Sequence, residues 1–173
     1  KNLPLIIDPT LVFATYTGSL SDNFGMTATY DVQGNAYTAG MCFGPSYPLS
    51  AGAFQINYMG GTGYGGDISI SKFNPTGSSL LYSTYLGGSG NESAESIIVD
   101  NLGELVIFGR THSVDFPITS GAFQTFNAGN FDLVVTKLNA TGTALNASTY
   151  LGGTQDEGVN GGVFLGGLHY NYS

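Results

Sequence analysis

Alternating apolar and polar positions along the chain predict short β-strands joined by tight turns. Over residues 26–30, Met26, Ala28 and Tyr30 fall on one side of an extended chain and two threonines fall on the other. No segment of useful length has a 3.6-residue period, so helix is expected to be minor. Similar extended segments recur, and we expect strands over residues 26–30, 35–40, 67–73, 80–86, 96–100, 104–109, 132–138 and 144–151.

The predicted strands belong to a long internal repeat. Its clearest phrase is Thr-Tyr, one further residue and Gly, which places Tyr16, Tyr85 and Tyr150 69 and then 65 residues apart. The first copy carries four additional residues within the glycine-rich stretch 59–66, where a surface loop tolerates an insertion. Three further pairs of anchors keep the 69-residue spacing: Gly34 and Gly103, Pro48 and Pro117, and Phe54 and Phe123.

Four strands per copy are typical of a β-propeller blade, because a propeller arranges four-stranded sheets radially around an axis. We therefore predict an all-β fold of four-stranded antiparallel blades, with about two and a half repeats of a β-propeller. The predicted division is residues 1–18 as the end of a preceding blade or a linker strand, 19–87 and 88–152 as two repeats, and 153–173 as the start of a truncated third.

The number of repeats bears on whether the chain is complete. A propeller needs about four blades or more, so two complete repeats do not close one. We expect the chain to be a segment of a longer protein, and residues 11–16 to be the last strand of a preceding blade. We also expect the segment to be poorly stable alone, because the outer faces of terminal repeats are unpaired. An open, stacked β-solenoid is the alternative architecture.

Composition agrees with many short strands and excludes several classes of protein. The chain has 27 Gly, 11 Tyr and 11 Phe, and only 9% of its residues are charged. Its net charge is −8 and its four cations are dispersed, so no basic cluster is present to bind nucleic acid. One cysteine excludes an internal disulfide framework, and no apolar run is long enough to predict a membrane span.

The chain from the end of the first copy through the second copy also resembles a known repeat. Its specific phrases are Leu81-Tyr82-Ser83-Thr84-Tyr85-Leu86-Gly87-Gly88, Asp100–Gly103, Phe108-Gly109-Arg110-Thr111, Asp115-Phe116-Pro117, Gly121-Ala122-Phe123-Gln124 and the stretch from Asp132 to Gly142. In this order they are similar to the SBBP repeat, a bacterial β-propeller repeat family. The first copy is more divergent, with Ser46 where the family has an acidic residue, and in the third copy Leu165 stands where Asp100 aligns.

The resemblance implies a propeller of seven or a similar number of blades in a large exported protein. Such repeats are frequent in Bacteroidota-like surface proteins, alongside adhesion-type domains and tails for type IX secretion, and the family has no common catalytic residues. The leading hypothesis is thus a non-catalytic structural or interaction module, secreted or on the bacterial outer cell surface, that serves adhesion or surface assembly. Its expected partners are the remaining blades, other surface proteins and glycans.

Few residues point to catalysis. His112 and His169 do not recur at the repeat spacing, and Cys42 lacks a neighbouring base, so neither a zinc site nor a nucleophile is expected. Asp67 and Glu92, with their counterparts in the next copy, are interpreted as structural because acids recur at these positions. A propeller-type hydrolase or lyase remains an alternative for which the sequence nominates no carboxylate.

Two sets of residues are candidate ligand sites. Asp31 and Asp100 open equivalent turns, where calcium, which prefers oxygen ligands, is an alternative to an ordinary side-chain-to-backbone hydrogen bond. No other cofactor is expected. Tyr58 and Tyr64 lie in the insertion region, where exposed aromatic rings could stack on a sugar, so a carbohydrate-binding propeller is the second hypothesis. The recurring Phe54 and Phe123 are expected to anchor their loops on the sheets.

Overall fold

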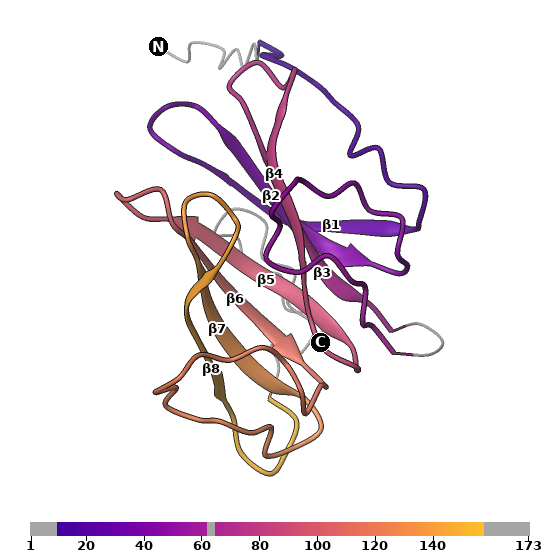
Figure 1. Cartoon of the computed structure of the whole chain (residues 1–173), viewed down its shortest axis with the longest axis vertical. Helices are drawn as coiled ribbons and strands as arrows, with labels where there is room; N and C mark the ends of the chain where they lie inside the picture. The colour runs from indigo at the N-terminus through magenta and orange to yellow at the C-terminus, as the bar shows by residue number, and fades with distance from the viewer. Residues whose placement is uncertain (1–9, 62–64, 158–173) are drawn as a thin grey trace, which may run out of the picture.

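The computed structural model describes residues 10–61 and 65–157, which form two open, four-stranded antiparallel sheets (Figure 1). The eight predicted strands are confirmed, each displaced by a few residues at most. The described ranges contain no helix, and therefore no helix that is long and apolar enough to cross a membrane. The first sheet contains β1 (Asn23–Tyr30), β2 (Ala36–Cys42), β3 (Asp67–Phe73) and β4 (Leu80–Leu86), and the second contains β5 (Glu92–Val99), β6 (Leu105–Thr111), β7 (Asp132–Leu138) and β8 (Leu145–Leu151).

In both sheets the strand order follows the sequence, as expected when each strand pairs with the next through a hairpin or loop. The sheets fall inside the predicted repeats 19–87 and 88–152. The register is interrupted at equivalent points, between Gly25 and Thr27 in β1 and between Ala94 and Ser96 in β5. A bulge at the same place in both copies bends β1 and β5, the first strand of each sheet, alike, so the sequence repeat is also a repeat of backbone geometry.

The first hairpin of each sheet depends on one glycine. Gly34 has a φ of 82° and Gly103 a φ of 77°, a left-handed conformation that glycine adopts without a steric penalty. Their amides donate to the carbonyl oxygens of Asp31 and Asp100, at 2.9 and 3.0 Å. The Asp-x-x-Gly phrase therefore closes both turns in the same way and sets the pairing of the flanking strands.

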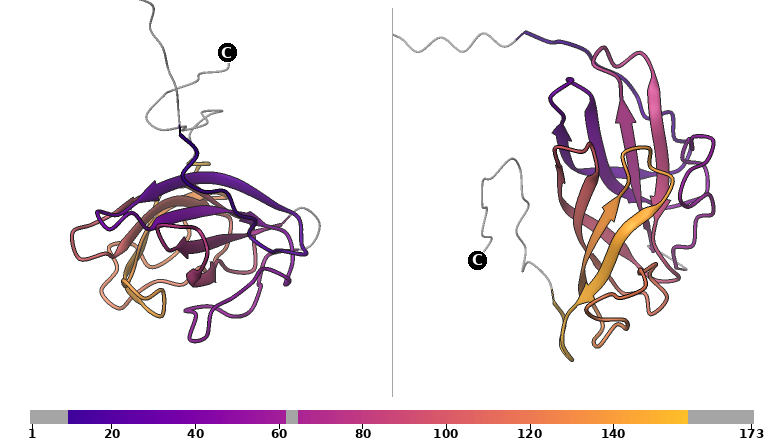
Figure 2. Two further views of the ribbon diagram at one scale, coloured as in Figure 1. Left: turned by 90° about the horizontal axis from the view of Figure 1, so that it is seen from above. Right: turned by 60° about the vertical axis from the view of Figure 1, so that its left-hand side comes forward.

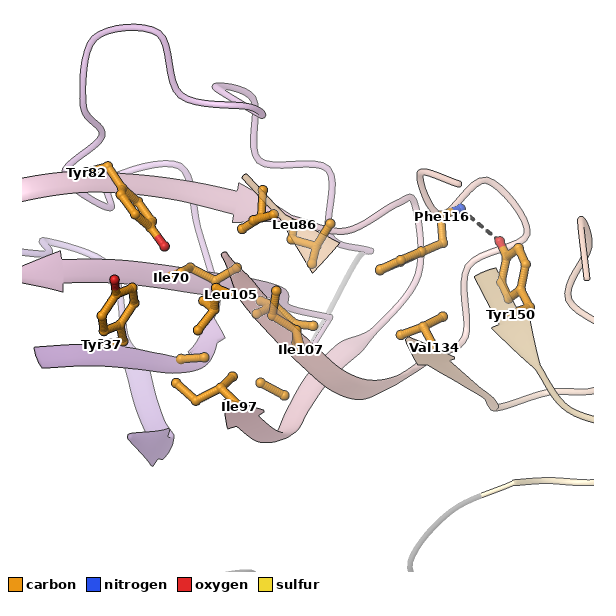
Figure 3. Packing of buried hydrophobic residues seen from close by; sticks show 14 residues of the cluster. Tyr37, Ile70, Tyr82, Leu86, Ile97, Leu105, Ile107, Phe116, Val134 and Tyr150 are labelled. Atoms are coloured by element: carbon orange, nitrogen blue, oxygen red, sulfur yellow. Dashed lines mark hydrogen bonds between the residues drawn. The ribbon is translucent and has the colours of Figure 1, made fainter. Parts of the chain in front are cut away.

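The two sheets pack face to face around a common core (Figures 1 and 2), in which β5 contacts β1, β2 and β3. Figure 3 shows Ile70 and Leu86 of the first sheet close to Leu105 and Ile107 of the second. The approach is close at Gly109, where a Cβ atom would lie 3.4 Å from Cδ1 of Ile68. Burial of these apolar side chains is the main force holding the sheets together.

The same strand is buried differently in the two copies. In β3, Ile68 and Ile70 are fully buried because the second sheet covers them. Their counterparts in β7, Leu133 and Val135, are only half-buried, and β7 alternates between buried and half-buried positions. One face of the second sheet is therefore not covered by the described residues, although its sequence is as apolar as the covered face of the first sheet.

Residues 11–16 differ from the prediction, because they do not form a strand. A strand needs a neighbour that pairs with its backbone, and no described segment pairs with these residues. The segment nevertheless places Phe13 over Gly77, just as β4 places Tyr82 over Gly142. Phe13 and Tyr82 are equivalent positions of the repeat, so the side-chain contact is kept where the strand is absent.

Candidate functional site

A groove with a volume of about 590 Å³ lies between the β1–β2 turn and the β5–β6 turn. It forms because the two Asp-x-x-Gly turns lie next to each other at one end of the packed sheets. Tyr30, which is 78% exposed, lines the groove together with the amide side chains of Gln33, Asn35 and Asn101. An exposed aromatic ring beside several amides is suited to a neutral polar ligand.

Asp31, one of the two predicted calcium ligands, lies in this groove but is already engaged by protein groups. Its Oδ1 accepts hydrogen bonds from the backbone amides of Gln33 and Asn35, and its Oδ2 accepts one from the Tyr37 hydroxyl at 3.0 Å. Lys72 Nζ lies 3.5 Å from Oδ2. Burial alone would raise the pKa of Asp31, but the hydrogen bonds and the lysine charge outweigh it and lower the pKa.

Asp100, the second predicted calcium ligand, has the equivalent arrangement. Its Oδ1 accepts hydrogen bonds from the amides of Leu102 and Glu104, and Lys137 Nζ lies 2.7 Å from its Oδ2. The hydrogen bond from Lys137 lowers the pKa of this carboxyl. Both aspartates thus bind backbone amides and a lysine, and within residues 10–61 and 65–157 no three His, Cys, Asp or Glu side chains converge as a metal site.

Tyr58, a predicted sugar-stacking residue, is half-buried rather than free. Its ring packs edge-on against Tyr85, with the ring centroids 5.9 Å apart, and its hydroxyl donates to the carbonyl oxygen of Gly65 at 2.5 Å. Burial raises the pKa of Tyr58 to about 12. These contacts hold the β2–β3 loop in place. Tyr64, the other predicted residue, lies outside the described residues.

The repeated tyrosines of the Thr-Tyr phrase anchor the long loop of each sheet. The Tyr85 hydroxyl donates to the Gly44 carbonyl at 3.1 Å and accepts from the Tyr47 amide at 3.0 Å. Tyr150 makes the same two bonds with Ser113 and Phe116, and the second of these is drawn in Figure 3. Tyr16, their counterpart, is 95% exposed because no sheet surrounds it in the described structure. The loop prolines also lie beside the anchored segments, Pro48 close to Gly18 and Pro117 accepting a bond from Ser148.

The two loop phenylalanines differ from each other, which the sequence did not predict. Phe54 packs against the core, and its amide donates to the carbonyl oxygen of Gly142 in the second sheet at 3.0 Å. Phe123 is 84% exposed. The prediction that it anchors its loop on the sheet is therefore wrong within the described structure. The reason is that Phe54 rests on the following sheet, and no described residue occupies the equivalent place for Phe123.

One pair of functional candidates was missed because the sequence separates its members by 25 residues. Asp67 and Glu92 are 0% and 1% exposed and meet at Gly87, where the two sheets join. Asp67 Oδ2 accepts hydrogen bonds from Gln55 Nε2 at 3.1 Å and from the Met59 amide at 2.9 Å, whereas Oδ1 has no partner. The signal in the sequence that could have indicated this pair is the two glycines after β4. The two acids leave no room for a side chain at Gly87, so a glycine is needed at this position.

Comparisons with known proteins give no family assignment. No protein-family model matches the chain, and no curated protein matches it.

Proposed function

We propose that this chain is part of a β-propeller of SBBP-type repeats and acts as a non-catalytic structural and interaction module of a larger secreted or bacterial cell-surface protein. The observation that carries the proposal is the unequal burial of β3 and β7. Ile68 and Ile70 are covered by the next sheet, and the half-buried Leu133 and Val135 occupy the same positions of the repeat.

The unequal burial suggests what covers the second sheet. Its open face presents Val106, Phe108, Leu133 and Val135, all half-buried, and its loop presents the exposed Phe123. Each corresponds to a position of the first sheet that packs against the second, including Phe54. The partner that best fits this face is a further four-stranded sheet of the same repeat, supplied by the remainder of the protein.

A longer chain tests this part of the proposal. We would insert one more copy of residues 88–152 after Gly152 and measure unfolding in urea. In a repeat protein each added interface contributes to stability. The urea midpoint should therefore rise, and the added sheet should shield Leu133 and Val135 from solvent. The control is the same longer chain with Leu133→Lys and Val135→Lys, in which the urea midpoint should not rise. A longer chain no more stable than this control would contradict the proposal.

The shape of a chain with seven copies distinguishes a propeller from a solenoid. A propeller closes into a compact ring with a central channel, whereas a stacked solenoid lengthens with every copy. Small-angle scattering or electron microscopy of this chain should show a ring. Elongated particles would mean that the sheets stack without closing.

Carbohydrate binding is the second candidate, and the groove beside Tyr30 favours it over the region of Tyr58. The groove combines an exposed ring with amide groups, a combination that binds sugar hydroxyls and stacks on sugar rings. Glycan-array binding that Tyr30→Ala abolishes and Tyr58→Phe leaves intact would support it. Catalytic turnover of a glycan, lost on a single carboxylate substitution, would instead support the hydrolase or lyase alternative.

A further inference from the structure

Two buried carboxylates from neighbouring sheets face the same glycine. Asp67 begins β3 of the first sheet, Glu92 begins β5 of the second, and both side chains are essentially inaccessible to water. A Cβ atom built on Gly87 would lie 2.6 Å from Asp67 Oδ1 and 2.7 Å from Glu92 Oε2. The two oxygens therefore lie around one small space at the junction between the sheets.

Hydrogen bonds from the protein satisfy three of the four carboxylate oxygens and leave Asp67 Oδ1 without a partner. Glu92 Oε1 accepts from the hydroxyls of Thr111 and Ser113, each at 2.5 Å, and Glu92 Oε2 accepts from the Gly88 amide at 3.1 Å. Asp67 Oδ2 accepts the two bonds from Gln55 and Met59 described above. Asp67 Oδ1 is thus a buried oxygen aimed into the space it shares with Glu92.

The surroundings of this pair supply no positive charge. Neither carboxylate takes part in an ion pair among the described residues. His112, the histidine of the described residues, packs its ring against Phe131, with the ring centroids 5.1 Å apart. The titratable groups that face Asp67 from the packed strands and loops are acidic or neutral near pH 7, and they are Cys42 of β2, Tyr58 of the β2–β3 loop, Tyr85 of β4, Glu92 of β5 and Asp115 of the β6–β7 loop.

Two buried negative charges so close together are strongly unfavourable, so the pair requires one positive charge. Calcium would require about six to eight oxygen ligands, and no three acidic, His or Cys side chains converge in the described part of the chain. A proton requires only the two facing oxygens. We propose that Asp67 and Glu92 bind one proton between them, and that this shared proton joins the two sheets.

Part of this arrangement recurs 65 residues later, which argues against an accident of packing. Asp132 Oδ1, like Asp67 Oδ1, is a buried oxygen without a partner, and Glu157 Oε2 is a further one. Gly152 replaces Gly87, with its would-be Cβ 2.6 Å from Asp132 Oδ1. The Glu157 amide donates to the Phe131 carbonyl at 2.6 Å, as the Glu92 amide donates to Gly66 at 2.8 Å. The buried aspartate beside a glycine, with one oxygen left without a partner, is thus kept in the second copy.

The shared proton makes stability depend on pH with a defined sign. Burial raises the pKa of Asp67 to about 7 and also raises the pKa of Glu92. In the unfolded chain both groups lose their protons near pH 4. Between about pH 4 and pH 7 the folded state therefore holds one more proton than the unfolded state. The stabilisation is complete below this window and is lost as the pH rises through it, with the unfolding equilibrium constant rising up to about tenfold per pH unit.

The test is urea unfolding of the whole chain between about pH 5 and pH 8, for the wild type and for Asp67→Asn. An asparagine amide donates permanently to Glu92, so Asp67→Asn should lose the rise in the unfolding constant over this range. Asp22→Asn, a change at an exposed acid, is the matched control and should keep it. An unchanged pH dependence in Asp67→Asn would overturn the proposal.

A second measurement avoids reliance on a variant that fails to fold. Carbon-13 NMR of the side-chain carboxyls in the wild-type chain should show one carboxyl of the pair titrating near pH 7, and ionisation of both near pH 4 would refute the shared proton. Calcium at about 1 mM, in the range of weak extracellular sites, should leave the urea midpoint unchanged at pH 7.5. A saturable calcium effect that disappears in Asp67→Asn would show a cation site in place of the proton.

Discussion

The unequal burial of equivalent positions predicts unequal costs for the same substitution in the two copies. Ile68→Ala removes three carbon atoms from a fully buried site in β3, and Leu133→Ala removes three from the half-buried equivalent in β7. At about 0.8 kcal/mol per buried carbon, the transfer cost at Ile68 is about 2.5 kcal/mol. The cavity against Gly109 and the second sheet raises the total to about 3–4 kcal/mol. At Leu133, with no covering sheet, we expect about 1 kcal/mol.

The measurement is urea unfolding of the wild type and the two variants, followed by tyrosine fluorescence and by circular dichroism. The difference between the two costs, about 2–3 kcal/mol, exceeds the error of the extrapolation. Equal costs, or a larger cost at Leu133, would refute the claim that Ile68 is covered by a neighbouring sheet and Leu133 is not. In the longer chain with an added copy of residues 88–152, Leu133→Ala should become as costly as Ile68→Ala, because the new sheet would bury it.

Three further predictions concern the turns, the loop anchors and the aspartate of the groove. Gly103→Ala places a Cβ at a φ of 77° and should cost about 1–2 kcal/mol in urea unfolding, and an equally stable variant would contradict the turn geometry. Tyr85→Phe leaves the buried Gly44 carbonyl and Tyr47 amide unpaired and should lower the free energy of unfolding by about 1–3 kcal/mol. Hydrogen exchange should become faster in residues 44–47, and unchanged exchange near Tyr150 is the internal control. Because its pKa is lowered in the folded state, Asp31 contributes stability above about pH 4 that is lost as the pH falls further. In Asp31→Asn the free energy of unfolding should therefore fall less steeply with decreasing pH below about pH 4. An unchanged dependence on pH in this range would count against the ion pair with Lys72.

The elements of the fold could be predicted from local sequence. Alternation identifies β1 and β2, and the phrases Asp31–Gly34 and Asp100–Gly103 identify the turns that follow β1 and β5. These signals are local because side-chain alternation and a left-handed φ are properties of a few consecutive residues. The division into copies follows for the same reason, since a repeat is read by comparing the chain with itself.

The candidate sites were harder to predict because they depend on how the two sheets meet. Asp67 and Glu92 each looked like an isolated recurring acid, and only the packing of β5 against the first sheet brings them to the same glycine. Phe54 and Phe123 have the same sequence context, yet one is covered and the other is 84% exposed. Tyr58 looked like an exposed aromatic residue of a loop, and a contact with Tyr85 makes it an anchor instead.

The sequence by itself determined that the protein is all-β, that it repeats, and, to within a few residues, where the eight described strands and the hairpin turns between them lie. Only the tertiary structure decided which sheet faces are covered, where the groove beside Tyr30 opens, and that Asp67 meets Glu92. The physical reason is the range of the interactions. Strand and turn preferences act between neighbours along the chain, whereas burial and the shared electrostatics of two acids depend on surfaces that become neighbours only when one sheet packs on the next.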